Sequence, residues 1–175
     1  MSVNVVKDAD FRLVYNKTFQ LLFKISYRIV NDDDAAEDLV HDSLIKMHEK
    51  KMVFPSVDEA KYWLICVVKN ASLNYAKRKT RERRAYERVI KEDSRKMDTG
   101  ETALLKKDAK KRAIEALNKL PVNLKMVLVL REYAELNYKE IGRVMGITEG
   151  NVKVRVFRAR EQLSKLIGED DVYLP

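Results

Sequence analysis

Apolar residues recur at intervals of three and four along almost the whole chain, and no segment alternates strictly between apolar and polar positions. Such spacing is typical of amphipathic helices, so the pattern predicts an all-α protein. The first helix is expected at residues 10–30 and the second at residues 35–50, where Asp34 and Glu37 have the spacing of a capping box. A third helix is expected to begin near residue 58 and to become steadily basic toward its end.

The periodic pattern weakens at residues 85–104, which are polar and contain one of only five glycines in the chain. This composition is typical of a flexible linker. Helical spacing resumes after the linker, and Pro121 separates two further helices. We therefore predict two small helical domains, residues 1–84 and 105–175, joined by a linker at residues 85–104.

Two short helical patterns meet at a corner within residues 138–163. Asn137 and Glu140 have the spacing of an N-terminal capping box for the first of these helices. Gly146 suits the left-handed position that ends a helix, and Thr148 can cap the helix that follows. This arrangement predicts a helix-turn-helix in the C-terminal domain.

The second helix of this pair has one apolar face and one basic face. Its predicted buried stripe consists of Val152, Val156, Ala159, Leu163 and Leu166. Between residues 149 and 167, five basic side chains stand against two acidic ones, a net charge of +3. After a capped corner, such a helix is expected to enter the major groove of DNA. A solvated surface helix or a membrane-surface helix is the alternative.

Four side chains of this helix are expected to point away from its buried stripe: Lys153, Val154, Phe157 and Arg158. The aromatic ring has two interpretations. Phe157 could be an ordinary core residue, but it lies off the Val152/Val156 stripe, which favours contact with a thymine methyl group or a sugar.

The chain of 175 residues has a formal net charge of +8, which favours a polyanionic partner, either nucleic acid or an acidic membrane surface. Its single cysteine, Cys66, has no partner for a disulfide, and His41 and His48 are not at a usual zinc-site spacing from it. We therefore expect neither a metal site nor a cofactor. Without a signal-peptide pattern or a run of about 18 to 20 apolar residues, the chain is expected to be cytoplasmic and not inserted into a membrane.

Charge is distributed unevenly over the N-terminal half. The segment "NDDDAAEDLVHD" has six acidic side chains and no Lys or Arg, whereas residues 69–95 hold ten basic side chains against four acidic ones, or +6. The acidic surface is expected to bind a protein and the basic one nucleic acid. Trp63, which precedes the basic stretch, is either a core anchor, as its apolar neighbours favour, or a platform on which a base stacks.

Three segments resemble the extracytoplasmic-function sigma factors of bacterial RNA polymerase. The segment "AAEDLVHDSLIKMH" resembles the family's Ala-Glu-Asp-Leu-Val-Gln helix, and "YWLICVVKNASLNYAKRKTRERR" resembles its Trp-Leu…Asn…Asp-x-x-Arg helix. The segment "LNKLPVNLKMVLVLREYAELNYKEIGRVMGITEGNVKVRVFRAREQL" resembles its C-terminal helix-turn-helix domain. The sequence departs from the family at His41, usually Gln, at Asn74, commonly Asp, at Val154, frequently Ser, and at Asn151, usually Thr.

The resemblance implies a dissociable polymerase subunit with two DNA-binding surfaces. The N-terminal domain would bind the clamp helices of the largest polymerase subunit through Asp38, Leu39, His41 and Asp42. It would hold the melted minus-ten promoter element with Trp63, Asn70, Asn74, Lys77, Arg78 and Lys79. The C-terminal domain would rest on the flap of the second-largest subunit and bind the minus-thirty-five element with Lys153, Val154, Arg155, Phe157 and Arg158. The family also implies an anti-sigma factor as a partner.

Two other classes of function are alternatives to a sigma factor. A stand-alone helix-turn-helix regulator would bind operator DNA tightly without polymerase, with the N-terminal half as a dimerisation or effector module. An enzyme acting on nucleic acid would need a carboxylate cluster joined to His or Lys at catalytic spacing, which the sequence lacks. We therefore expect a non-enzymatic DNA-binding protein.

Overall fold

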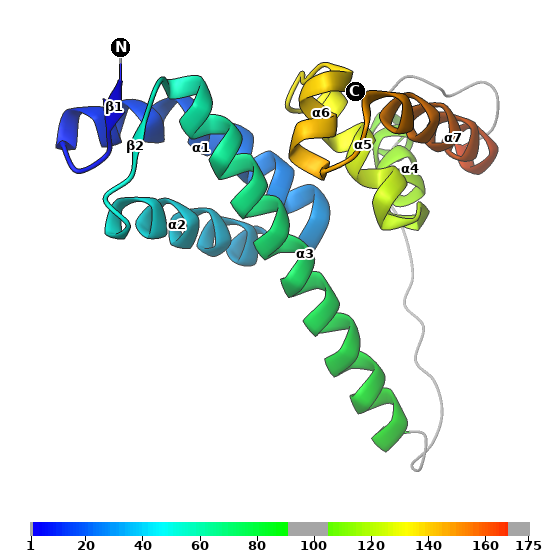
Figure 1. The fold of residues 1–175 in the computed structure, drawn as a ribbon. Helices are drawn as coiled ribbons and strands as arrows, with labels where there is room; N and C mark the ends of the chain where they lie inside the picture. The colour runs from blue at the N-terminus through cyan, green and yellow to red at the C-terminus, as the bar shows by residue number, and fades with distance from the viewer. Residues whose placement is uncertain (1, 91–104, 168–175) are drawn as a thin grey trace. The chain divides into compact units, whose positions relative to one another are not determined.

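The computed structural model describes residues 2–90 and 105–167 (Figure 1). The chain forms two compact units, Met1–Ser94 and Arg95–Pro175, and both are helical. The prediction of an all-α protein with two helical domains is confirmed. None of the helices formed by the described residues is long and apolar enough to cross a membrane.

The described residues of the first unit form three helices, in which α1 (Asp8–Val30) packs against both α2 (Asp33–Glu49) and α3 (Val57–Ile90). A hydrogen bond of 2.8 Å between the hydroxyls of Ser26 and Ser72 joins α1 to α3 inside the core. The core side chains include Val14, Leu22, Ile25, Val40, Leu44, Met47, Leu64, Ile65 and Val68. These residues lie at the helical spacing from which the three helices were predicted.

Two short strands, β1 (Val3–Asn4) and β2 (Val53–Phe54), pair in antiparallel orientation near the N-terminal ends of α1 and α3. Val3 and Phe54 face each other in this pairing, and both are buried. Strands of two residues are too short to produce an alternating pattern, so they could not be predicted from the sequence. Their contribution is to hold the N-terminal segment against the turn that precedes α3.

The start of α2 differs from the prediction. Asp32, not Asp34, is the N-cap, and its carboxylate accepts a hydrogen bond of 3.0 Å from the backbone N–H of Ala35. The reason is that Asn31, the C-cap of α1, is in the left-handed conformation (φ 55°), which leaves Asp32 extended and in the cap position. Asp34 therefore lies inside the first turn, and the predicted capping box with Glu37 was wrong.

Helix α3 is longer than the sequence indicated. It reaches Ile90 and so continues six residues into the range predicted as a linker; residues 91–104 of that range lie outside the described residues. All side chains from residue 77 to residue 88 are exposed, so no buried face produces a periodic pattern there. This segment contains no Gly or Pro and is rich in Lys, Arg and Glu, which have high helix propensity.

Residues 105–167 of the second unit form four helices: α4 (Leu105–Lys119), α5 (Val122–Glu132), α6 (Tyr138–Met145) and α7 (Glu149–Ile167). Helix α5 is its centre, because every side chain from Leu124 to Leu130 is buried. Helix α7 packs against α4, α5 and α6. The last two helices therefore form a helix-turn-helix that rests on a buried support.

Candidate nucleic-acid and polymerase interfaces

The corner between α6 and α7 has the caps predicted for it. The backbone N–H of Asn137 donates to Glu140 Oε2 at 2.7 Å, and the backbone N–H of Glu140 donates to Asn137 Oδ1 at 2.9 Å. Gly146 ends α6 in the left-handed conformation, with φ 67°. Thr148 Oγ1 accepts a hydrogen bond of 3.3 Å from the N–H of Asn151 in the first turn of α7. Both ends of the corner are therefore fixed by local hydrogen bonds.

A close backbone approach fixes the corner further. The N–H of Ile147 donates to the carbonyl of Gly142 at 3.0 Å. A Cβ atom at Gly142 would lie 2.6 Å from the carbonyl oxygen of Ile147, closer than real Cβ atoms come to other atoms. Only glycine therefore allows α6 and the turn to approach this closely.

Helix α7 buries one stripe and exposes the opposite face. Val152, Val156, Ala159 and Leu163 are buried as predicted. Leu166 is 46% exposed, so its assignment to the stripe was wrong; it lies in the last turn of α7. Val154 is also 46% exposed and Phe157 is 71% exposed. Phe157 is therefore not a core residue, and its ring is available to a partner of this helix.

Several basic side chains of α7 form ion pairs. Lys153 Nζ lies 2.9 Å from Glu149 Oε1, and Arg160 Nη2 lies 3.3 Å from Glu132 Oε1 on α5. The Arg160 pair connects two helices, whereas the Lys153 pair lies within α7. Both of its side chains are about half exposed, so the Lys153 ammonium can leave Glu149 for a stronger acceptor at small cost. Arg158 is exposed and Arg155 half-buried.

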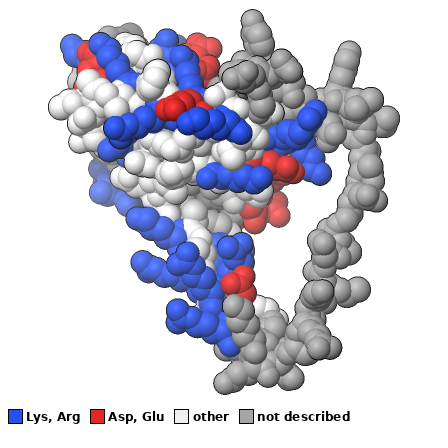
Figure 2. Space-filling view, turned by 90° about the vertical axis from the view of Figure 1, so that its right-hand side faces the viewer, with Lys and Arg blue, Asp and Glu red and all other residues white. Residues whose placement is uncertain are grey.

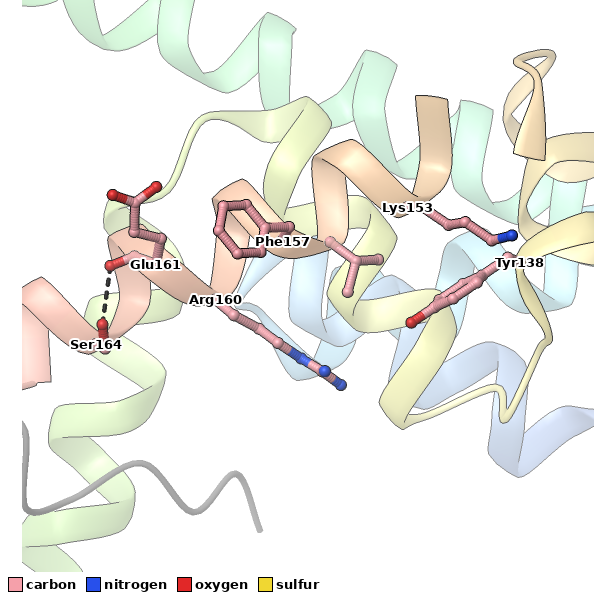
Figure 3. Close-up of a pocket in the computed structure, with 7 residues that line it drawn as sticks. Tyr138, Lys153, Phe157, Arg160, Glu161 and Ser164 are labelled. Carbon is pink, nitrogen blue, oxygen red and sulfur yellow. Dashed lines mark hydrogen bonds between the residues drawn. The ribbon is translucent and has the colours of Figure 1, made fainter. Parts of the chain in front are cut away.

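An open groove of about 570 Å³ lies beside the exposed ring of Phe157. It is lined by Tyr138, Lys153, Val156, Phe157, Arg160, Glu161 and Ser164 (Figure 3). Tyr138 is the first residue of α6, and the Arg131 guanidinium lies 5.2 Å from the centre of its ring. The position of Tyr138 beside α7 could not be predicted from the sequence, because only the folded corner brings the start of α6 beside α7.

The polymerase-binding residues predicted on α2 do not have equal exposure. Asp38 and Asp42 are exposed and lie one helical turn apart, on the side of α2 away from its buried residues. Leu39 and His41 are half-buried. His41 Nε2 lies 3.4 Å from the hydroxyl of Tyr15, and its ring centre lies 5.2 Å from that of Phe19. His41 is thus held against α1, whereas the two aspartates point to solvent.

The predicted minus-ten residues follow α3 from the core to its exposed part. Trp63 is half-buried, and its ring is tilted against that of Phe54 at 6.0 Å. Asn70, Asn74 and Lys77 are exposed, and with Trp63 they follow intervals of seven, four and three residues, which place all four on one face. Arg78 and Lys79 instead lie over the ring of Tyr75, at 5.4 and 5.7 Å.

Comparison with protein families gives a match in each unit. Residues 14–82 match the family model described as sigma-70 region 2, and residues 110–163 match the one described as sigma-70 region 4. Relatives named extracytoplasmic-function sigma factors match across both. The chain is an extracytoplasmic-function sigma factor of the sigma-70 family. Most of the helix-turn-helix lies in the region-4 match, and α2 with most of α1 and α3 lies in the region-2 match.

Two curated relatives illustrate how far the similarity of this sigma factor extends. It is 28% identical over 166 residues to the sigma-E factor of Haemophilus influenzae, covering 90% of this chain and 87% of the relative. It is 27% identical over 161 residues to the sigma factor SigM of Bacillus subtilis, covering 91% and 93%. The similarity therefore includes both helical units.

Solved structures have the same fold. The sigma factor RpoE of Bartonella quintana, solved in complex with the anti-sigma factor NepR, matches with a TM-score of 0.62 at 22% identity, over 92% of this chain and 98% of that chain. CnrH, solved in complex with the cytosolic domain of CnrY, matches with a TM-score of 0.67 at 18% identity, over 94% and 91%.

A row of aromatic side chains on α1 of the sigma factor was not anticipated. It consists of Phe11, Tyr15, Phe19, Phe23 and Tyr27, all half-buried. Consecutive rings have their centres 5.0 to 6.5 Å apart. His41 and His48 of α2 also contact this row. The repeated spacing of four residues was the signal in the sequence that could have identified the row, because residues four apart are neighbours on a helix.

Proposed function

We propose that this sigma factor binds core RNA polymerase through its first unit and directs transcription from specific promoters. The single observation that supports this best is the order of two matched regions, each with its own exposed basic helix surface. One protein then carries two separate contacts with DNA, so a promoter is selected by two sequence elements. A stand-alone regulator needs only the second surface and is not favoured.

The polymerase contact is assigned to α2. Asp38 and Asp42 are exposed on its outer side, with Leu39 and His41 at the two edges of that side. Carboxylates around an apolar residue suit a basic protein surface, because charge complementarity orients the partner and the apolar side chain adds buried area. We propose that this surface binds the clamp helices of the largest subunit.

The minus-ten contact is assigned to α3. Asn70 and Asn74 can donate to and accept from the edges of an unpaired base, and Lys77 can hold a neighbouring phosphate. Trp63 lies on the same face and offers part of its ring for stacking. Arg78 and Lys79, placed over Tyr75, supply positive charge along the strand. Removing a base from the duplex costs a few kcal/mol, which such contacts offset.

The minus-thirty-five contact is assigned to α7. Val154 and Phe157 expose apolar atoms suited to thymine methyl groups, and Lys153 and Arg158 can donate to guanine in the major groove. Arg155 is closer to the core and suits a phosphate contact. We place the first domain at residues 1–84 and the second at residues 105–175. The second domain as a whole would rest on the polymerase flap.

An anti-sigma factor is a further expected partner, since RpoE was solved with one. A protein that covers either basic surface would prevent promoter binding. Because transcription takes place in the cytoplasm of bacteria, we assign the sigma factor to that compartment.

Run-off transcription tests the proposal. Purified bacterial core polymerase, free of other sigma factors, is combined with the protein and with genomic promoter fragments. Specific transcripts that depend on the protein are expected. Tight, sequence-specific binding by the protein alone, without any transcript on the bound fragments, would instead identify a stand-alone regulator.

A charge reversal tests the assignment of α2. Asp38→Arg is expected to weaken binding to core polymerase, whereas Glu37→Arg, an equal change at the exposed neighbouring position on another side of α2, should have a much smaller effect. Affinity of fluorescently labelled protein for core polymerase gives the comparison. Equal losses in both variants would mean that net charge, and not this surface, governs the binding.

A further inference from the structure

The last part of α3 is a strongly basic helix outside the core. Residues 77–88 are all exposed and carry seven basic side chains against two acidic ones, a net charge of +5. This part of α3 is the lower end of that helix in Figure 1, and Figure 2 shows blue side chains gathered along it. The match to sigma-70 region 2 ends at residue 82, so half of the segment lies beyond the matched region.

Three arginines of this segment lie on the same face as the proposed minus-ten residues. Arg81, Arg84 and Arg88, here called the arginine stripe, follow Lys77 at intervals of four, three and four residues. The same spacing runs back through Asn74 to Asn70. The stripe is therefore a direct continuation of that face of α3, away from the core.

The acidic side chains of the segment do not neutralise the stripe. Glu82 pairs with Arg78 at 3.6 Å, and Glu87 pairs with Arg83 at 3.4 Å. Both of these arginines lie on other sides of the helix. Within residues 2–90 and 105–167, no carboxylate forms an ion pair with a stripe arginine. The ion pairs thus support the helix, while the charge of the stripe remains available to a partner.

The composition of the stripe favours duplex DNA over a single strand. Binding to single strands relies on aromatic rings for stacking. The nearby rings, Tyr75 and Tyr86, are each two residues from Lys77, Arg84 or Arg88 and so point to the other side of the helix. From Lys77 to Arg88 the helix rises about 16 Å, which corresponds to about five phosphates along one strand of a duplex.

We propose that Arg81, Arg84 and Arg88 form a phosphate-binding site for double-stranded promoter DNA adjoining the minus-ten element. The site rests on the proposed function and adds a contact to it. Its ligand is the duplex backbone, so it strengthens binding without reading sequence. It extends the DNA surface of the first unit beyond the region-2 match.

The test compares the triple variant Arg81→Gln/Arg84→Gln/Arg88→Gln with the control Arg83→Gln, which removes a neighbouring arginine from another side of the helix. Glutamine keeps a high helix propensity, and circular dichroism verifies that the helix remains. Each protein is bound to core polymerase, and its affinity for DNA is measured at several salt concentrations. One probe carries duplex next to the minus-ten element, and the other is the single-stranded element alone.

On the duplex probe, the triple variant should lower the slope of log affinity against log salt by about 2.7, for three lost phosphate contacts. Between 50 and 200 mM salt, the wild type should then lose about 40-fold more affinity than the variant. The single-strand probe and the control variant should show little change. An unchanged slope, equal losses on both probes, or weaker binding of the variant to polymerase itself would each overturn the proposal.

The two proposals fail in different ways. Absence of protein-dependent transcripts from the wild type counts against the sigma function and says nothing of the stripe. In that case the full-length chain alone is measured on a plain duplex, without polymerase or promoter. A lower salt slope for the triple variant supports the stripe, and equal slopes refute it.

Discussion

Helix α7 and the last part of α3, residues 77–88, are both helical, basic and exposed to solvent, yet they are stabilised in different ways. Helix α7 buries Val152, Val156, Ala159 and Leu163 against three other helices. The last part of α3 buries nothing and relies on helix propensity and on ion pairs within the helix.

This difference has a consequence for DNA recognition. Base readout needs side chains held in a fixed position relative to the base edges, which a packed helix after a capped corner provides. Phosphates tolerate more variation, because charge acts in all directions and every base step has the same backbone. Helix α7 is therefore suited to selecting sequence, and the end of α3 to holding DNA of any sequence.

The largest difference in stability between α7 and the last part of α3 should appear when one apolar or aromatic side chain is truncated in each. Leu163→Ala removes a buried side chain of α7 and should lower the free energy of unfolding of the second unit by about 2 to 5 kcal/mol. Tyr86→Ala removes a ring that is 67% exposed on α3 and should change stability by no more than about 0.5 kcal/mol. Chemical denaturation measures both; a large loss from Tyr86→Ala would show that the end of α3 is packed.

The corner that positions α7 should be sensitive to a single methyl group. Gly142→Ala places a Cβ against the carbonyl of Ile147 and should cost about 1 to 3 kcal/mol. Gly150→Ala is the matched control: its Cβ meets open space in the first turn of α7, so a small gain of about 0.5 kcal/mol is expected. Thermal unfolding compares the two, and equal stability of both variants would contradict the close approach at the corner.

The same contrast explains which features could be predicted from the sequence. The corner was predicted residue by residue because Asn137, Gly146 and Thr148 act through local hydrogen bonds and backbone conformation. The end of α3 could not be predicted, because an exposed helix has no periodic pattern of apolar residues to mark where it ends. The choice of Asp32 as cap depended on where Asn31 turned the chain; each of the three adjacent aspartates is a suitable cap residue, and the spacing to Glu37 favoured the wrong one, Asp34.

Features that depend on contacts between helices were harder to predict. The exposed face of α7 followed from its buried stripe, so the exposure of Val154 and Phe157 could be anticipated. The Arg160–Glu132 pair and the position of Tyr138 beside α7 depend on how α5, α6 and α7 pack. No spacing within one helix contains that information.

Removing single basic side chains should show that α7 binds DNA with sequence specificity and that the last part of α3 does not. Lys153→Ala and Arg158→Ala should each weaken binding by about 1 to 3 kcal/mol on promoters with the preferred base, and much less on promoters without it. Lys79→Ala should weaken binding to all promoters alike and lower the salt slope by about 0.9. Affinities of the holoenzyme for a panel of minus-thirty-five sequences provide the measurement. A uniform loss from Lys153→Ala across the panel would refute its proposed role in reading bases.

The smallest expected effect concerns the last turns of α7, where charge stabilises a helix that is already packed. Lys165 Nζ donates to Glu161 Oε1 at 2.8 Å, and this hydrogen bond, with the charge of Lys165 and then of Arg158, lowers the pKa of Glu161 below its ordinary value. A lowered pKa means that folding favours the ionised carboxylate, so its contribution to stability is present above the ordinary pKa of a glutamate and is lost as the pH falls through the lowered value.

Glu161→Gln should therefore be slightly less stable than the wild type at neutral pH, and the difference should disappear in acid. Because the pair is exposed, added salt should reduce the difference at neutral pH as well. Unfolding curves of both proteins from neutral to acidic pH test this, and a difference that grows toward low pH would contradict the pairing of Glu161 with Lys165.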